Sequence, residues 1–409
     1  MPAVSPLAPA GFPELEPIPG VRLAAYAAGV RYSGRNDVML AELAPGTTIA
    51  GVLTQSTTPG APVDWCRACL PGGSVRAIVV NSGNANVFTG RAGREVCERT
   101  AAAAAELFGC SPREVFISST GVIGEPPPAE KIVKAIPKIA ALLDASAWEP
   151  AARAIMTTDT FPKGATATAS IGGTTVRING FCKGSGMIAP DMATMLAYLF
   201  TDAALPPAVL QPLLKGTADK SFNCLTVDGD TSTSDTLLLC ATGQARNAVI
   251  GRADDPGLAD FHRALDEVSV DLAQQLARDG EGAEKFVTIE VTGAENDRAA
   301  RRIGLSIGNS PLVKTAIAAG DANWGRIVMA VGKAGEKAER DRLSIAVGGI
   351  RIAAEGGPVP GYREGPVSEH MAGREIRISI DLGLGSGRAT IWTCDLTHGY
   401  IDINGSYRS

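Results

Sequence analysis

The sequence predicts a layered α/β fold, and three observations favour it. Apolar residues make up 45% of the 409 positions and charged residues 20%, which is enough apolar content for a sizeable core. Short apolar runs bounded by glycine and proline occur together with longer helical segments. Strands and helices are mixed without strict βαβ alternation, which indicates sheets covered by helices. The length predicts two domains or one large α/β domain, at roughly 150 residues per domain.

The order of the expected elements follows from these runs. Short apolar and β-branched runs predict strands over 77–80, 115–118, 165–171, 174–178, 195–200, 286–291 and 302–307. Amphipathic segments predict helices near 91–107, 129–143, 150–156, 206–218, 258–278 and from Pro311 onward. Gly172-Gly173 predicts a hairpin turn, and polar loops are expected at 81–86 and 119–121. The last third is expected to be rich in strands up to 400–404.

Charge and hydropathy exclude several classes of function. The net charge is −5 and no Lys/Arg cluster forms a basic face, so nucleic acid and anionic membranes are poor partners. No Lys or Arg precedes Arg22 and no apolar core of a signal peptide is present. No apolar run approaches the ~18 residues of a membrane helix. We therefore expect a soluble, cytoplasmic protein.

Cysteine and histidine usage narrows the chemistry. Of the eight cysteines, only Cys66 and Cys69 have C-x-x-C spacing, and no second ligand pair matches them. This favours isolated thiols over a metal or redox site, so no metal is expected. The chain has only three histidines, which leaves little material for a Ser-His or Cys-His catalytic arrangement.

Residues 183–196, with the sequence KGSGMIAPDMATML, are the most informative stretch. Gly184 to Ala189 match G-x-G-x-x-A, a loose dinucleotide fingerprint that requires a helix to begin there. Pro190 falls about one turn into that helix, where it would disrupt it, which disfavours a nucleotide site. The acidic stretch 228–235 likewise fails the EF-hand template at its sixth and twelfth positions. A hydrogen-bonded turn near a polar pocket is predicted there instead.

Thr194 stands where this loop becomes a strand. A threonine at a strand start is usually structural, but Ala193 is small, and the preceding glycines and proline allow a bend that exposes its carbonyl. Attack by the Thr194 hydroxyl would move the acyl group from nitrogen to oxygen, and hydrolysis of that ester would free an N-terminal threonine. Its α-amine, with a reference pKa of roughly 7.7–8.0, suits a general base. One residue would then supply both nucleophile and base without a histidine.

An acyl-transfer nucleophile also needs an oxyanion hole. Thr120-Gly121 offers a hydroxyl and a backbone N–H at the end of a predicted strand. Loss of one such donor typically removes ~3–4 kcal/mol of transition-state stabilisation. On these residues alone, a simple turn is the favoured interpretation.

Residues 183–196 closely resemble the self-cleavage segment of the bifunctional ornithine acetyltransferase family of arginine biosynthesis, the ArgJ family. Other segments resemble family motifs in family order, so the resemblance spans nearly the whole chain. These segments are 80–86, 118–124, 156–160, 228–233, 308–315, 321–326 and 392–397. Two positions depart from the family pattern: Ser409 stands where threonine is common, and Asp191 stands where an amide is common.

The resemblance implies a layered α/β sandwich of the ArgJ type, distinct from the N-terminal-nucleophile hydrolases. It implies cleavage between Ala193 and Thr194 into an α chain, 1–193, and a β chain, 194–409, usually assembled as α2β2. Thr194 would take acetyl from N2-acetylornithine and pass it to glutamate by ping-pong chemistry. No cofactor is implied, although acetyl-CoA serves some members as a co-substrate.

The resemblance also implies a set of site residues. Thr120 and Gly121 would form the oxyanion hole. Substrate binding would fall to Thr157, Lys183, Thr194, Glu281, Asn404 and Ser409. Lys183 can meet an α-carboxylate and Glu281 an ammonium group, although both also fit ordinary surface charges. The alternatives are an autoprocessed hydrolase, such as a β-peptidyl aminopeptidase, and a non-enzymatic binding protein with the same fold.

Overall fold

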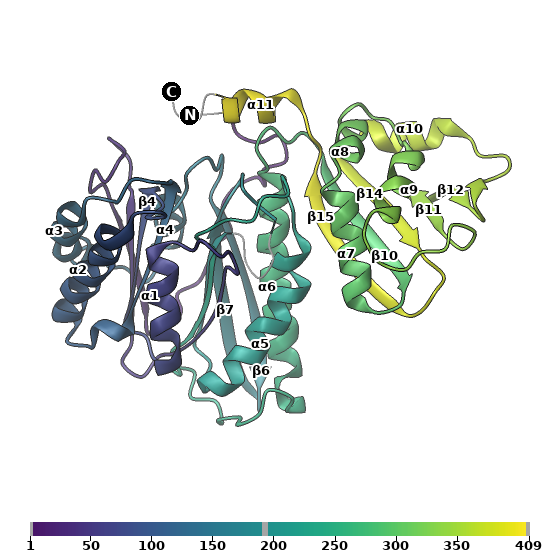
Figure 1. The fold of residues 1–409 in the computed structure, drawn as a ribbon. Helices are drawn as coiled ribbons and strands as arrows, with labels where there is room; N and C mark the ends of the chain where they lie inside the picture. The colour runs from purple at the N-terminus through teal and green to yellow at the C-terminus, as the bar shows by residue number, and fades with distance from the viewer. Residues whose placement is uncertain (1–2, 190–194, 406–409) are drawn as a thin grey trace.

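The structure, a computed structural model, describes residues 3–189 and 195–405. These residues form three mixed β-sheets with helices on their outer faces (Figure 1). The first two sheets pack against each other, and the third belongs to the C-terminal part of the chain. The layered α/β prediction is therefore confirmed. In the described part of the chain, no helix is both long and apolar enough to cross a membrane.

The first sheet has the order β1-β2-β4-β5. Its strands are β1 (Val21–Tyr26), β2 (Val38–Leu43), β4 (Ala77–Asn84) and β5 (Val115–Val122). Strands β4 and β5 are parallel and continue into the segments where polar loops were predicted, so those loop predictions were largely wrong. The polar side chains can stay in a buried strand because they bond one another: Ser119 Oγ donates to Asn81 Oδ1 at 2.6 Å.

The second sheet has the order β3-β9-β8-β7-β6. Its strands are β3 (Thr48–Leu53), β6 (Lys163–Ile171), β7 (Thr174–Lys183), β8 (Leu196–Thr201) and β9 (Thr236–Ala241). The predicted hairpin is confirmed, since Gly172 and Gly173 both have positive φ, as a tight two-residue turn requires. Strands β7 and β8 are antiparallel, and Lys183 pairs with Leu196.

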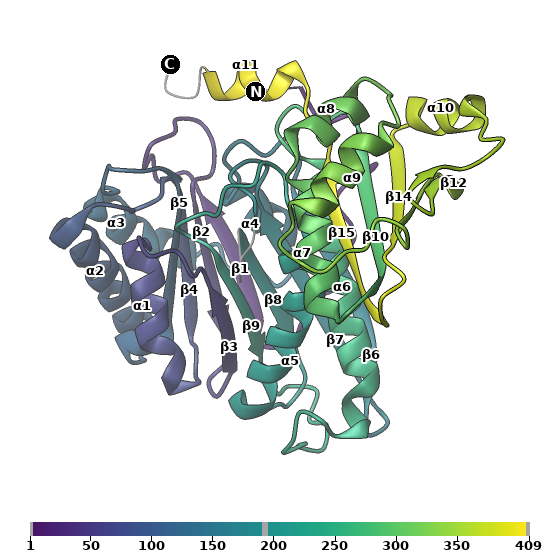
Figure 2. The same ribbon diagram turned by 45° about the vertical axis from the view of Figure 1, so that its right-hand side comes forward.

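The two sheets enclose a core rich in aromatic side chains. Trp148 begins α4 (Trp148–Ala154), and its ring centroid lies 6.4 Å from that of Phe181 and 5.6 Å from that of Phe200. Outside the first sheet lie α2 (Gly90–Phe108) and α3 (Ala129–Ala140), with α1 (Ala61–Cys69) beside β5. Outside the second lie α5 (Pro207–Lys220) and α6 (Ala259–Arg278), as Figure 2 shows. The result is a helix–sheet–sheet–helix sandwich.

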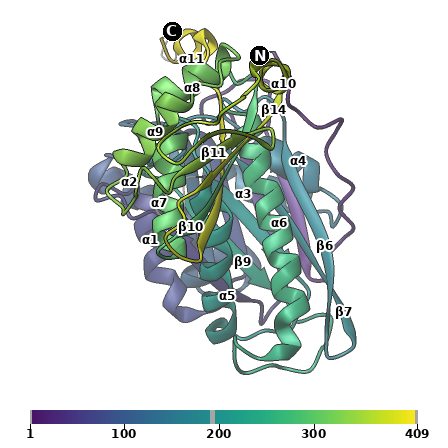
Figure 3. The same ribbon diagram turned by 90° about the vertical axis from the view of Figure 1, so that its right-hand side faces the viewer.

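The C-terminal part adds the third sheet, in the order β13-β12-β11-β14-β10-β15. Its strands are β10 (Phe286–Ala294), β11 (Ser344–Val347), β12 (Ile350–Ala354), β13 (Gly357–Pro358), β14 (Glu375–Asp381) and β15 (Gly387–Cys394). Its helices are α7 (Asp297–Gly308), α8 (Pro311–Ala318), α9 (Trp324–Gly332), α10 (Glu364–Ala372) and α11 (His398–Gly405). Figure 3 shows α6 running between this part and strands β6 and β7.

Two predictions for this part were wrong. Residues 302–307 were expected to form a strand but lie within α7. Their alternating apolar residues suggested a strand, yet the buried Ile303 and Ile307 are four positions apart, as on one face of a helix. Asn296 caps this helix by accepting the N–H of Ala299 at 3.0 Å. Residues 400–404, expected at the end of a strand-rich region, belong to α11.

The segments 1–193 and 194–409 share the second sheet, although the bond predicted to be cut lies outside the described residues. Strands β3, β6 and β7 precede that bond, and β8 and β9 follow it. We therefore predict that cleavage leaves the two pieces bound through the sheet hydrogen bonds and the common core. Native size-exclusion chromatography should give one peak, and a denaturing gel of that peak should give two bands. Separate native peaks for the two pieces would contradict the interleaved sheet.

Candidate active site

A cavity of ≈ 310 Å³ lies where the ends of β5 and β7 meet the start of β8. Six residues singled out from the sequence line it, although they are spread along the chain from Thr120 to Asn404. They are Thr120, Gly121, Thr157, Lys183, Glu281 and Asn404. The predicted residues Ala193, Thr194 and Ser409 lie outside the described residues. Met195, the neighbour of Thr194 in sequence, lines the same cavity.

Lys183, at the end of β7, connects two hydroxyl groups of the cavity wall. Its Nζ donates to Thr120 Oγ1 at 2.8 Å and to Thr157 Oγ1 at 3.0 Å. An ammonium group only donates, so both hydroxyl oxygens act as acceptors, and each can donate its own proton elsewhere. That is the property an oxyanion-hole hydroxyl needs. Lys183 is therefore not a solvated surface charge.

The environment of Lys183 acts on its charge. Burial lowers the pKa of Lys183 from its ordinary value, because removing water disfavours the ammonium form. The carboxylates of Asp159, Asp235 and Glu281 act in the opposite direction. The Lys183 ammonium therefore loses its proton more easily than that of a solvent-exposed lysine.

Gly121 follows Thr120 in β5 and occupies a position that only glycine fits. Its φ is +124°, a backbone conformation that side chains rarely adopt. A Cβ atom there would lie 2.3 Å from the carbonyl carbon of Gly83 on the neighbouring β4. The close approach of the two strands thus depends on glycine at this point, beside the cavity.

Glu281 supplies the cavity with a carboxylate. It follows α6, its N–H donates to the carbonyl of Ser185 at 2.9 Å, and its Oε2 accepts from Asn404 Nδ2 at 2.7 Å. The carboxylate packs over Gly186, where an added Cβ would lie 2.4 Å from Oε2. Burial raises the pKa of Glu281. The loop after β7 and helix α11 therefore hold this carboxylate together.

The stretch 228–235 contributes residues that the sequence analysis did not place in the site. Asp235 lines the cavity and is buried, and its Oδ2 has no hydrogen-bond partner among the described residues. Burial raises the pKa of Asp235 well above its ordinary value. Asp228 accepts the N–H groups of Met187 at 2.6 Å and Ile188 at 2.9 Å. The predicted hydrogen-bonded turn near a polar pocket is confirmed, and its acidic residues were the available signal.

The competing sites proposed by sequence patterns find no support. Residues 184–189 form an irregular loop after β7 and do not begin a helix, so the dinucleotide pattern lacks its structural context. The thiol of Cys66 is buried and donates to the carbonyl of Ile117 at 3.1 Å, and burial raises its pKa. Within residues 3–189 and 195–405, no group of three or more His, Cys, Asp or Glu side chains could hold a metal ion.

The chain was compared with protein families and with known proteins, and it matches one enzyme family. A profile of the ArgJ family matches residues 22–409. The arginine biosynthesis bifunctional protein ArgJ of Gluconobacter oxydans is 60% identical over 99% of this chain and 96% of its own length. The protein of the same name from Rhizobium meliloti is 57% identical over 100% of this chain and 99% of its own. A solved ArgJ structure from Bacillus halodurans is 40% identical, covers 50% of this chain and 96% of that one, and gives a TM-score of 0.49.

The chain therefore belongs to the ArgJ family. Membership confirms the family predicted from residues 183–196, and with it an acetyltransferase of arginine biosynthesis rather than the aminopeptidase alternative.

The close contact at Gly121 leads to a stability prediction. Gly121→Ala should lower the free energy of unfolding by about 1–3 kcal/mol more than Gly124→Ala, because it adds a backbone clash to an unfavourable φ. Gly124 is the matched control, since its φ is +94° and no atom lies within 4 Å of an added Cβ. The control alone should lose ~1–2 kcal/mol. Urea denaturation of both variants measures the difference, and equal losses would show that the β4–β5 contact tolerates a methyl group.

Proposed function

We propose that this protein transfers the acetyl group of N2-acetylornithine to glutamate through an acyl-threonine on Thr194, after self-cleavage between Ala193 and Thr194. The observation that carries the proposal is one cavity holding a lysine ammonium, a carboxylate and two threonine hydroxyls. Met195 and Leu196, which follow Thr194 in the chain, line the same cavity. The proposed nucleophile is thus attached to the cavity wall.

Substrate binding follows from the charges in this cavity. N2-acetylornithine and glutamate share an α-carboxylate, which Lys183 would bind by a charge-assisted hydrogen bond. Glu281, oriented by Asn404, would bind the side-chain ammonium of ornithine. The Thr157 hydroxyl accepts from Lys183 and would donate its proton to a substrate oxygen. Ser409 completes the proposed set from the C-terminus.

The proposed reaction has two acyl-transfer steps. The α-amine of Thr194 takes the proton of its own hydroxyl, whose oxygen attacks the acetamide carbonyl. The Thr120 hydroxyl and the Gly121 N–H donate to the oxyanion, the C–N bond breaks, and ornithine leaves with the transferred proton on its α-amine. The α-amine of glutamate then attacks the acetyl ester, and Thr194 regains its proton. The products are ornithine and N-acetylglutamate.

We further propose acetyl-CoA as a second acetyl donor. The relatives carry the name bifunctional, and a thioester can acylate the same threonine hydroxyl without any other cofactor. We also propose that the cleaved enzyme assembles as α2β2 in the cytoplasm. The sheet shared by the two segments supports the pairing of one α piece with one β piece. The proposal that acetyl-CoA is a second donor is tested by incubating the enzyme with acetyl-CoA and glutamate and measuring N-acetylglutamate.

The acyl-enzyme can be observed directly. Incubation with N2-acetylornithine but no glutamate should add one acetyl group to the piece that begins at Thr194, and later addition of glutamate should remove it. Intact-mass measurement follows both steps. Thr194→Ala should stay a single uncut chain without activity, whereas Thr194→Ser, which keeps a hydroxyl, should still be cut. Free acetate accumulating without glutamate would instead support a hydrolase.

Lys183 leads to a prediction for pH dependence. Its lowered pKa means that the ammonium is lost as pH rises, at a pH below the ~10.4 of a free lysine. We predict that kcat/KM for acylation by N2-acetylornithine declines on the alkaline side below that pH. Lys183→Arg should lower the maximum but move the decline to higher pH, because guanidinium keeps its proton. An unchanged alkaline decline in this variant would exclude Lys183 as the titrating group.

A further inference from the structure

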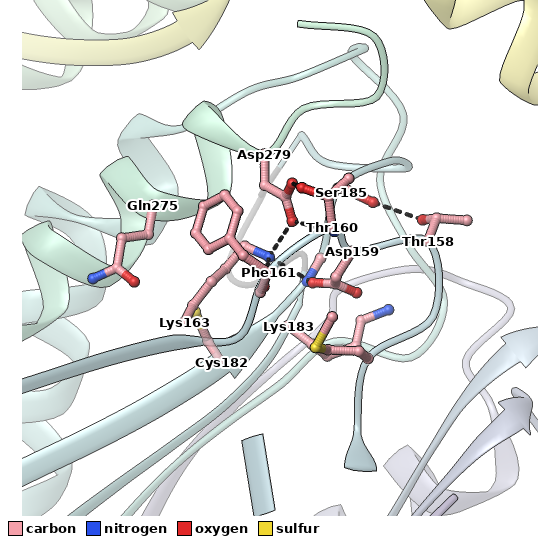
Figure 4. Close-up of polar contacts among 12 residues, drawn as sticks. Thr158, Asp159, Thr160, Phe161, Lys163, Cys182, Lys183, Ser185, Gln275 and Asp279 are labelled. Atoms are coloured by element: carbon pink, nitrogen blue, oxygen red, sulfur yellow. Dashed lines mark hydrogen bonds and ion pairs between the residues drawn. The ribbon is translucent and has the colours of Figure 1, made fainter. Parts of the chain in front are cut away.

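Lys163, Asp159 and Asp279 form a fully buried charged cluster, and Figure 4 shows it close to Lys183. Lys163, the first residue of β6, places its Nζ 2.7 Å from Asp159 Oδ1 and 2.6 Å from Asp279 Oδ2. The side chains of all three residues are completely buried. None of them lines the cavity, and the proposed mechanism does not use them.

Asp159 connects this cluster to Lys183. Its Oδ1 also accepts the N–H of Gly184 at 2.6 Å, and its Oδ2 accepts the N–H of Thr157 at 3.0 Å. Gly184 follows Lys183 in the chain, and the Thr157 hydroxyl accepts from Lys183 Nζ. One carboxylate therefore fixes the backbone beside Lys183 and the residue that its ammonium contacts. The ammonium groups of Lys163 and Lys183 outweigh the effect of burial and lower the pKa of Asp159 to about 2, so it is ionised.

Asp279 connects the same lysine to Glu281. Its Oδ2 accepts the N–H of Thr160 at 2.9 Å, and its Oδ1 accepts from the Thr160 hydroxyl. Asp279 is the C-cap residue that follows α6, and Glu281 is two positions further along the chain. The N–H of Glu281 donates to Ser185, in the loop that begins after Lys183. Asp279 thus fixes the start of the short loop that carries the Glu281 carboxylate.

We propose that Lys163, together with Asp159 and Asp279, is a positioning group that sets the separation between Lys183 and Glu281. It thereby determines the side-chain length of the donor amino acid that the site accepts. The inference rests on the proposed function, in which Lys183 binds the α-carboxylate and Glu281 the terminal ammonium. A buried ion pair adds little net stability compared with apolar packing, but its geometry is specific. We call the contact of Lys163 with Asp159, which leads to Lys183, the Lys183 arm, and its contact with Asp279, which leads to Glu281, the Glu281 arm. One buried cation bonded to two carboxylates holds both arms at a fixed spacing.

The consequence concerns selectivity between homologous donors. N2-acetyllysine is one methylene longer than N2-acetylornithine, and sites commonly separate such pairs by roughly 10–200-fold in kcat/KM. That ratio depends on a fixed distance between the two charged receptors. Glutamate has no terminal ammonium, so its binding depends on the Lys183 arm alone. Disturbing the Lys183 arm should therefore affect the binding of both substrates, whereas disturbing the Glu281 arm should affect only the donor.

Asp159→Asn and Asp279→Asn test the arms separately, because each leaves Lys163 paired with one carboxylate. Asp159→Asn should raise KM about tenfold for both N2-acetylornithine and glutamate. Asp279→Asn should raise KM for N2-acetylornithine by a similar factor and lower the ornithine-to-lysine selectivity ratio, with KM for glutamate changed less than about twofold. Asp266→Asn is the matched control, since it removes an ion pair with Lys220 at 2.8 Å on the same helix α6. This control should leave both KM values and the ratio unchanged.

Two further variants separate this inference from the proposed function. Lys183→Met and Glu281→Gln alter the receptors themselves; unchanged KM values in both would overturn the proposed roles and the inference with them. Lys183→Met and Glu281→Gln are expected to raise KM. If they do, but Asp159→Asn and Asp279→Asn lower kcat equally for every substrate and leave the ornithine-to-lysine selectivity ratio unchanged, only the positioning role fails. Should Asp279→Asn not fold, Thr160→Val weakens the same arm and should shift the ratio in the same direction. An unchanged ratio in Thr160→Val would then overturn the proposal.

Discussion

The two hydrogen bonds of the Lys183 ammonium connect parts of the molecule that are far apart in the sequence. Thr120 belongs to the first sheet, Lys183 to the second, and Thr157 to the connection between α4 and β6. The site therefore exists only when the two sheets are packed. Phe181, two residues before Lys183 on β7, lies in the aromatic core that joins the sheets. Core packing and site geometry thus depend on the same strand.

Burial makes it easier for the two oppositely charged groups of this site, Lys183 and Glu281, to lose their charges. It lowers the pKa of Lys183 and raises that of Glu281, so each group is shifted toward its uncharged form in the free enzyme. A substrate that brings a carboxylate to one and an ammonium to the other supplies the missing partners. The binding energy of such a substrate then comes from satisfying charges that the protein has already removed from water. A neutral acyl compound would gain none of it.

The sequence was informative where structure depends on neighbours in the chain. Gly172-Gly173 predicted its hairpin, and Pro190 argued against a helix after Gly184. Local patterns failed at 302–307, where alternating apolar residues occur within a capped helix. They failed also at the ends of β4 and β5, because the bond between Asn81 and Ser119 crosses two strands. The cluster of Lys163 and Asp279 spans more than a hundred positions, so no local pattern could pair them. Thr120 and Lys183 were associated only through family resemblance.

The pairing of Lys183 with Leu196 explains how a chain could be cut inside its own active site and keep its fold. Lys183 and Leu196, the residues on either side of the segment 184–195, belong to antiparallel strands of one sheet, and the hydrogen bonds between those strands do not require the connection between them. Thr194 lies outside the described residues and precedes Leu196, the partner of Lys183 in the sheet, by two positions in the sequence. A cut before Thr194 would therefore leave a new terminus next in sequence to Met195 and Leu196, which line the cavity. The proposed nucleophile would then be held by the strand that follows it, and the sheet hydrogen bonds would not depend on the bond proposed to be cut.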